Sequence, residues 1–265
     1  MPAYRRRHEV RVKGIELKTS AQIAKLREAN LIVSDVLDAI AAAATVGQST
    51  WDMEMVARRR LKELCAEPAF LGYRGYPAVL CASVNSVIVH GIPRKDVVLK
   101  DGDILSVDFG AFKDGWCGDS ARTLLIGNVA PKARALVEAT RVSLEKAIEQ
   151  CVPGNRLGDI GFAVQSYVEA RGYSVVEQFA GHGIGRHMHE PPQVMNYGPS
   201  WRGPRLSVGM VLAIEPMVNE GGPEVVIDDD GWTAVTKDGS LSAHFEHSVA
   251  ITENGPMVLS RAQNG

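Results

Sequence analysis

The sequence has few aromatic residues and no excess of charge of either sign. Aromatic side chains make up 6% of its 265 residues, and 29 Lys and Arg stand against 31 Asp and Glu. This near balance gives no support to a DNA-binding domain, which would present a strongly basic face. The one basic cluster, Arg5–Arg7, is predicted to be a solvated terminus, with a contact to RNA or an acidic partner as the alternative.

Cysteine pairs and long apolar runs are also missing. Four cysteines lie far apart and form no Cys-x-x-Cys pair, so we expect reduced thiols at Cys65, Cys81, Cys117 and Cys151. No stretch approaches the roughly 18 apolar residues that a membrane span requires. The N-terminal arginines are not followed by the apolar core of a signal peptide. We therefore expect a soluble, cytoplasmic protein without a membrane partner, and we expect it to be a monomer.

After a charged, irregular extension over 1–18, hydrophobic periodicity and turn residues predict the same succession of elements twice. Helices are predicted over about 20–46, 50–65, 131–151 and 157–170. Short strands between turn residues are predicted over 79–83, 87–90, 104–109, 123–126, 175–178, 210–215, 225–227, 233–235 and 247–252. The order is two helices followed by strands, then two helices followed by strands.

When the sequence is aligned with itself at the shift that places Asp108 on Glu215, part of the first set of helices and strands matches part of the second. Each of these two acids ends an apolar strand, and Asp52 falls on Asp159 at the same shift. Three further positions match: Leu99, Gly102 and Leu105 fall on Leu206, Gly209 and Leu212. Repetition at so long a period predicts two related halves, about 19–127 and 131–256, that close one structure. A chance match of apolar positions is the alternative.

Four carboxylates occupy similar settings beside the predicted strands. Asp108 and Glu215 end strands, Asp119 starts one, and Glu246 directly precedes one. An acid beside a buried strand costs several kcal/mol unless it is paired or bound to a metal. A single such acid is usually a cap or an ion-pair partner, but four of them favour a metal site.

Three of the seven histidines lie within residues 182–189. His182 stands between two glycines, which allow the backbone to approach a ligand, and it is the predicted imidazole ligand. Oxygen ligands with one imidazole suit Mn²⁺, Fe²⁺, Co²⁺ or Zn²⁺. The glycine pattern lacks the Lys-Ser/Thr that would complete a phosphate-binding P-loop.

Seven motifs, taken together and in order, resemble the type I methionine aminopeptidases. They are V-H-G-I-P at 89–93, V-D-F-G at 107–110, G-D at 118–119, G-H-G-I-G at 181–185, M-H-E-P-P at 188–192, A-I-E-P-M at 213–217 and F-E-H at 245–247. The resemblance runs from about residue 15 to the C-terminus. It implies the α/β pita-bread fold, in which two pseudo-symmetric halves of a single domain, 19–265, surround a dinuclear metal centre.

The resemblance also implies how the ligands are shared between two divalent ions (Co, Mn, Fe or Zn). Asp108 would bind the first ion, His182 and Glu215 the second, and Asp119 and Glu246 would bridge both. Two ions about 3.5–4 Å apart need shared carboxylates to offset their repulsion.

Catalytic and substrate-binding residues follow from the same resemblance. Glu215 would accept and relay a proton, His189 would hydrogen-bond the scissile carbonyl, and His90 would contact the backbone after the scissile bond. A methionine pocket would be lined by Phe70, Tyr73, Tyr76, Cys81, Met188 and Trp232. A flexible thioether packs well against aromatic rings, although ordinary core packing is the alternative for those rings. Cys117 stands where many members of the family carry His, and Met188 stands where an aromatic residue is frequent. Neither is expected to touch a predicted ligand, but Met188 leaves the fine specificity open.

The implied function is removal of the initiator methionine from nascent polypeptides whose second residue is small, with a transient ribosome contact left open. One alternative is a proline-directed aminopeptidase or dipeptidase of the same fold, but the segment before His90 is too short for the extra domain of those enzymes. Another is a non-catalytic pita-bread binding protein, which would have lost metal ligands. The short step from Glu215 to Glu246 also leaves no room for the insertion of the type II enzymes.

Overall fold

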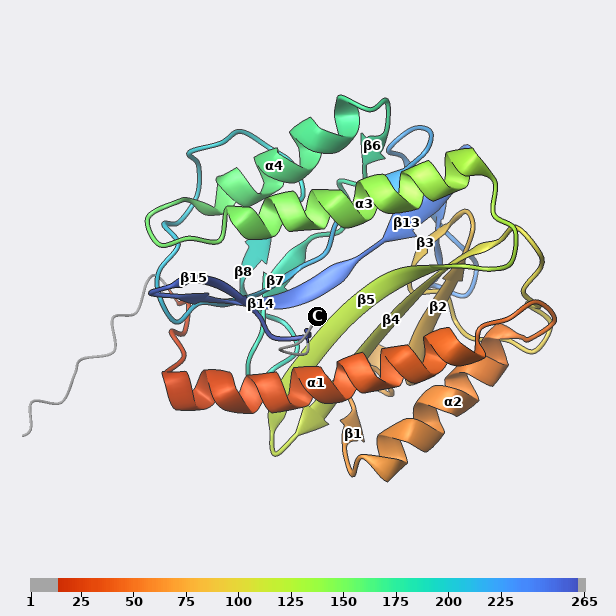
Figure 1. The fold of residues 1–265 in the computed structure, drawn as a ribbon, viewed down its shortest axis with the longest axis horizontal. Coiled ribbons are helices and arrows are strands. Elements are labelled where there is room, and N and C mark those ends of the chain that lie inside the picture. Colours follow the sequence, from red (N-terminus) through yellow and green to blue (C-terminus); the bar gives the residue numbers. More distant parts are fainter. Residues whose placement is uncertain (1–13, 262–265) are drawn as a thin grey trace, which may run out of the picture.

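A central nine-stranded sheet forms the middle of the molecule, and two pairs of helices flank it (Figure 1). The computed structural model describes residues 14–261. Its helices are α1 (Ser20–Ala43), α2 (Thr50–Glu63), α3 (Pro131–Glu149) and α4 (Leu157–Glu169). In spatial order the central sheet contains β1 (Glu67–Pro68), β4 (Ile104–Lys113), β5 (Trp116–Leu125), β14 (Glu246–Thr252), β9 (Val211–Ile214), β7 (Gly181–Gly183) and β8 (Glu190–Val194).

The remaining strands extend this sheet or form two smaller ones. Strand β2 (Leu80–Val84) pairs with β4, and β15 (Gly255–Val258) pairs with β14. One small sheet has the order β13 (Ser242–His244), β10 (Met217–Asn219) and β6 (Ser174–Val175). The other has the order β11 (Val225–Ile227), β12 (Ala234–Thr236) and β3 (Val87–Val89).

Local sequence explains where the first two helices begin. At the start of α1, Thr19 accepts a hydrogen bond from the Gln22 N–H (3.3 Å), and the Gln22 side chain accepts one from the Thr19 N–H (2.8 Å). Ser49 and Asp52 form the same reciprocal pair at the start of α2 (3.2 and 2.7 Å). Each capping box satisfies N–H groups that have no partner within the helix. All four predicted helices are confirmed, although each was predicted to end slightly too late along the chain.

The prediction that Asp108 ends a strand and Asp119 starts one was wrong. Strands β4 and β5 form one long hairpin, paired without interruption from Ile104↔Leu125 to Lys113↔Trp116. The two-residue turn between them is Asp114-Gly115, and both residues have positive φ (49° and 72°), as the tight turns that favour hairpins require. The sequence predicted that the first strand ends at residue 109, but the turn comes only after Lys113, so the strand continues past Gly110. Both aspartates therefore lie within paired strands. Six short strands (β1, β7, β8, β10, β13 and β15) were also not predicted.

Helix α1 packs closely on β4 and β5, next to one of the predicted ligands. A Cβ at Gly118 would lie 2.7 Å from the Ala29 carbonyl carbon and from the Asn30 nitrogen, so only glycine permits this approach. The Asn30 side chain in turn accepts a hydrogen bond from the Asp119 N–H (3.3 Å). The closeness of helix and strand thus helps to position the Asp119 backbone.

Residues 14–18 pack against the central domain. Ile15 is buried, the Lys18 N–H donates to the Gly209 carbonyl (2.7 Å), and the buried Lys18 ammonium lies 2.6 Å from a Glu190 carboxylate oxygen. The division into an extension and a catalytic domain stays a prediction, and the basic cluster Arg5–Arg7 lies outside the described residues. None of the helices within 14–261 has the length and apolar character needed to cross a bilayer. All four cysteines are unpaired.

Candidate metal centre and active site

Five neighbouring strands of the central sheet each carry or lead into one predicted metal ligand. In the order β4, β5, β14, β9 and β7, the ligands are Asp108, Asp119, Glu246, Glu215 and His182. Glu215 directly follows the last residue of β9. Residues that lie far apart along the chain are in this way brought to adjacent strands.

The register of the sheet places all five side chains on one face. Ala121, two residues after the β5 ligand, pairs with the ligands of both β4 and β14. Ser248, two residues after the β14 ligand, pairs with Ala213, which pairs in turn with the β7 ligand and stands two residues before Glu215. Directly paired residues point to the same side of a sheet, as do alternate residues along a strand. The five ligands therefore converge.

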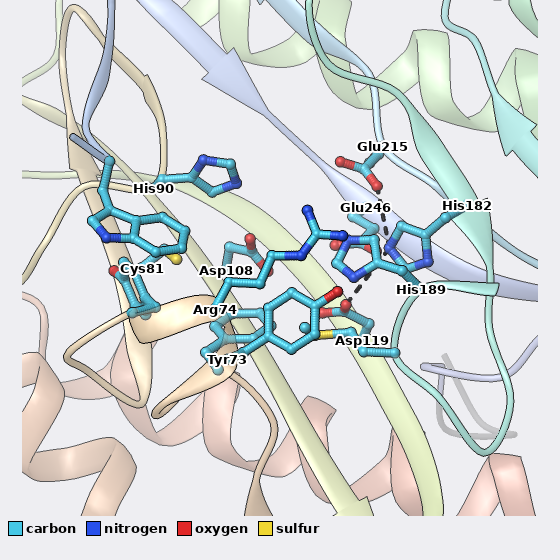
Figure 2. Close-up of a pocket in the computed structure, with 14 residues that line it drawn as sticks. Tyr73, Arg74, Cys81, His90, Asp108, Asp119, His182, His189, Glu215 and Glu246 are labelled. Carbon is cyan, nitrogen blue, oxygen red and sulfur yellow. Dashed lines mark ion pairs between the residues drawn. The ribbon is translucent and has the colours of Figure 1, made fainter. Parts of the chain in front are cut away.

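Donor atoms in this cluster lie close enough to share a cation. One donor atom each from Asp119, His182 and Glu246 falls within 4.8 Å of the other two. His182 Nε2 lies 3.9 Å from Asp119 Oδ2 and 3.5 Å from Glu215 Oε1 (Figure 2). The Nδ1 atom of His182 lies 3.0 Å from the Gly183 carbonyl oxygen. With its proton on Nδ1, the imidazole would donate to this carbonyl and leave the Nε2 lone pair, which faces the carboxylates, free to bind a cation.

Burial makes the ionised carboxylates costly. It raises the pKa of Asp108 to about 7 and raises the pKa of Asp119, Glu215 and Glu246 well above the usual range. For the last three acids, repulsion from neighbouring carboxylates raises the pKa further. Burial also lowers the pKa of His182 to about 4, so its imidazole is neutral at pH 7. A bound cation would offset the repulsion among these carboxylates and stabilise their ionised forms.

Unsatisfied oxygens indicate where that charge would bind. Within residues 14–261, Asp108 Oδ1, Asp119 Oδ1 and Glu246 Oε1 are buried and have no hydrogen-bond partner. Buried polar atoms are almost always paired, so such a group requires an explanation, of which a bound ion is one. Carboxylate oxygens with one neutral imidazole are the donors that divalent first-row metals accept. The residues present therefore fit a divalent metal site.

A cavity of about 160 Å³ joins these ligands to the predicted substrate-binding residues. Its lining includes all five predicted ligands and all eight predicted substrate-binding residues: Phe70, Tyr73, Tyr76, Cys81, His90, Met188, His189 and Trp232. One further residue of the lining, Arg74, was missed by the sequence analysis. No motif or apolar period marks it, and its only signal is its place after Tyr73 in a glycine-flanked turn.

Aromatic contacts fix the walls of the cavity. The Tyr73 ring stacks on the His189 imidazole (centroids 5.3 Å apart, planes at 20°), and the Tyr76 ring meets Trp232 edge-on (5.1 Å, 75°). Burial, and to a smaller extent the charge of His189, lowers the pKa of His90 to about 4. His90 also has a positive φ of 60°, a conformation that is uncommon outside glycine and often held at functional sites.

Comparisons with known proteins agree with this arrangement. Residues 24–253 match the model of metallopeptidase family M24. The chain is 48% identical to a methionine aminopeptidase of Aquifex aeolicus over 255 residues, which cover 93% of this chain and 99% of that protein. The crystal structure of methionine aminopeptidase from Thermotoga maritima matches with a TM-score of 0.92 at 46% identity, covering 94% of this chain and 100% of that one. This match confirms the predicted pita-bread fold.

A prolidase from Pyrococcus furiosus is similar to this chain in fold but much less similar in sequence. It matches with a TM-score of 0.76 at 23% identity, and the match covers 93% of this chain but 66% of the prolidase. The proline-directed alternative thus shares the fold alone. By its family match and its identity to full-length relatives, the chain belongs to metallopeptidase family M24 and, within it, to the methionine aminopeptidases of the short bacterial type.

Proposed function

We propose that this chain removes the N-terminal methionine from nascent proteins and peptides whose second residue is small, using two divalent metal ions. The observation that carries the proposal is the single cavity in which five converging ligand side chains adjoin a wall of aromatic and sulfur-containing residues. In this assignment Asp108 would hold one ion, His182 and Glu215 would hold the other, and Asp119 and Glu246 would be shared by both.

When bound, such ions lower the pKa of a coordinated water to about 7 and polarise the carbonyl to be cleaved. The side chains of this chain supply the remaining steps. His189 donates a hydrogen bond to the scissile carbonyl oxygen as negative charge develops there, an effect worth about 3–4 kcal/mol for a preorganised donor. His90 contacts the peptide after the scissile bond. The buried Glu215 carboxylate accepts a proton and passes it to the departing amine.

The proposal extends to the surroundings in which the enzyme works. Its substrates are the N-termini of nascent chains, it acts as a monomer in the cytoplasm, and a transient contact with the ribosome is consistent with that substrate. The donor set does not select one metal, because Mn²⁺, Fe²⁺, Co²⁺ and Zn²⁺ accept the same ligands and their availability decides.

Peptide hydrolysis by metal-free protein reloaded with each of these four ions tests the function. We expect release of methionine from Met-Gly-Xaa peptides with at least one ion and no cleavage of Xaa-Pro peptides. Met-Gly-Xaa and Met-Leu-Xaa form a matched pair for the restriction to small second residues. Cleavage of the proline peptides alone, or of none with any ion, would contradict the proposal.

A further inference from the structure

The active-site cavity is lined by a single cation. Among all the residues that line it, Arg74 is the only lysine or arginine, and it stands among four carboxylates, three histidines and the aromatic wall. Nothing in the proposed chemistry uses this charge.

The backbone holds Arg74 in an unusual conformation that turns its side chain toward the site. Arg74 lies in the 3-10 turn η1 (Tyr73–Gly75) with φ 50° and ψ 23°, the left-handed region that residues other than glycine rarely occupy. Hydrogen bonds close the turn on both sides, from the Gly72 N–H to the Tyr76 carbonyl (2.8 Å) and from the Tyr76 N–H to the Tyr73 carbonyl (2.9 Å). Such a conformation persists where the surrounding structure enforces it.

Contacts on one side tie the guanidinium to the catalytic histidine. The Arg74 guanidinium carbon lies 5.5 Å from the centroid of the Tyr73 ring, and that ring stacks on His189. Burial, followed by the charge of Arg74, lowers the pKa of His189. Figure 2 shows the Arg74 side chain extending into the cavity with its guanidinium directed toward His189.

Apart from its contact with the Tyr73 ring, the guanidinium has no hydrogen-bond or ion-pair partner in the described part of the chain. Carboxylates pair within 4.0 Å with six other arginines: Arg58, Arg60, Arg94, Arg122, Arg141 and Arg261. Among residues 14–261 no carboxylate lies that close to Arg74, which is exposed at the opening of the cavity. An arginine offers five N–H donors in a planar fork that fits a carboxylate with two parallel hydrogen bonds.

We propose that Arg74 is a specificity-determining residue that binds a substrate carboxylate just beyond the scissile bond and so favours an acidic third residue. The inference rests on the proposed function, which places the methionine side chain against the aromatic wall and the scissile bond beside His189. When the second residue is small, the third residue carries the first large side chain to emerge at the opening. In an extended peptide its Cα lies about 7 Å from the Cα of the methionine. In a tripeptide the free C-terminal carboxylate offers the same chemistry.

The test compares cleavage of Met-Gly-Glu-Gly-amide, Met-Gly-Gln-Gly-amide and Met-Gly-Lys-Gly-amide by the full-length chain loaded with Mn²⁺. We expect the wild type to cleave the Glu peptide about two- to fivefold more efficiently than the Gln peptide, the range for an exposed ion pair. Arg74→Gln should remove this preference, and Arg74→Glu should reverse it in favour of the Lys peptide. The ratio of kcat/KM values within one preparation does not depend on how much of a variant is folded.

Two controls complete the design. Arg141→Gln, which changes an exposed arginine of α3 outside the cavity, should keep the wild-type ratio. Met-Gly-Gly as free acid and as amide separates the C-terminal carboxylate from an acidic side chain. An unchanged Glu-to-Lys ratio in Arg74→Glu, alongside normal cleavage of the Gln peptide, overturns the assignment of Arg74 alone. Failure of every methionine peptide with every metal overturns the proposed function, and this inference with it.

Discussion

Comparison of the first half of the molecule with the second shows the same backbone contacts repeated at the shift that carries Asp108 to Glu215. The N–H of Gly47 donates to the Leu99 carbonyl (2.9 Å), and the N–H of Gly154 donates to the Leu206 carbonyl (3.1 Å). Both glycines have positive φ, at 91° and 98°. Each pair joins the connection between the two helices of its half to the segment before its central strand. The repeat in the sequence therefore corresponds to a repeated framework.

The framework extends to the first ligand of each half. Gly102 and Gly209 have nearly equal φ angles of 96° and 94°, and each stands the same number of positions before a ligand, Asp108 or Glu215. These two acids occupy equivalent positions at β4 and at the end of β9. A duplicated backbone thus supplies a carboxylate on each side of the centre.

Other equivalent positions carry different side chains. His182 pairs with Ala213, which by the same shift corresponds to Ser106, and Ser106 pairs with Ser83. Ser83 is therefore the counterpart of the histidine ligand. Its hydroxyl accepts a hydrogen bond from the Gly91 N–H (3.2 Å), beside the histidine proposed to contact the substrate. One half places a predicted metal ligand at this position, and the other places a serine that holds a loop.

The two bridging acids are not equivalent either. Around β5 and β14 the two halves match at a larger shift, one that carries Ile126 to Ile251. The reason is that the Gly102 N–H donates to the Ile126 carbonyl and the matching Gly209 N–H donates to the Ile251 carbonyl. By this larger shift Glu246 corresponds to Ala121, with which it pairs, and Asp119 comes two residues earlier. The two halves therefore share a backbone framework and one carboxylate each, Asp108 and Glu215, whereas the other three predicted ligands have no equivalent in the opposite half.

Replacement of Asp119 with Ala should have the largest effect, because we assign this residue to both ions. We expect binding of two ions to be lost and kcat/KM to fall by about a thousandfold or more, beyond the 10²–10³ of a single oxyanion donor. Metal content measured by mass spectrometry and a peptide assay provide the test. Asp108→Ala is the matched variant and should lose one ion of the two. Tight binding of two ions by Asp119→Ala would contradict the bridging role.

The next prediction concerns two acids that contact the matching strands β2 and β7, one in each half. Glu54 accepts bonds from two N–H groups at the start of β2, and Glu190 pairs with the buried Lys18 beside β7. Glu190→Gln leaves Lys18 with Glu16 as its second partner at 3.1 Å, so it should lower the free energy of unfolding in urea by about 2 kcal/mol rather than the roughly 3–5 kcal/mol of a fully unpaired buried charge. Glu16 is 54% exposed, and Glu16→Gln should cost under about 1 kcal/mol. Equal effects of the two variants would show that burial is not the cause.

A smaller effect is expected where the first helix of each half meets its sheet. By the shift that carries Ile126 to Ile251, Gly118 under α1 corresponds to Ala243, a buried residue of β13, which packs with α3. Gly118→Ala should cost about 1–3 kcal/mol by overpacking, because its Cβ would lie 2.7 Å from backbone atoms of α1. Ala243→Gly provides the reverse change. If Gly118→Ala left the thermal unfolding midpoint unchanged, α1 would be able to move away from the sheet and make room for a Cβ, as α3 does over Ala243.

The last prediction concerns pH and the histidine of the first half. Burial lowers the pKa of His90 to about 4, below the value of about 6.5 in an unfolded chain. Between these values the unfolded chain binds more protons, so stability rises with pH through this window and levels off above it. The free energy of unfolding should therefore depend less steeply on pH in His90→Gln, by up to about 1.4 kcal/mol per pH unit. Parallel curves for the two proteins would show that His90 titrates normally.

Much of the fold could be predicted because its signals are local. The capping pairs of Thr19 and Ser49 mark two helix starts, and Pro131 marks a third. Where strands begin and end was harder, since the hairpin of β4 and β5 depends on pairing between its two arms rather than on either arm alone. The short strands around His182 and Glu190 have no period of their own and exist through their neighbours.

The sequence by itself determined the types and order of the ligands, the repeat that relates Asp108 to Glu215, and the membership of the family. These follow from residue identity and spacing along the chain. Only the tertiary structure decided that five strands would present those ligands on one face, because register is set by pairing between distant segments. It also decided that burial would raise the pKa values of the acids and that Arg74 would stand alone among them.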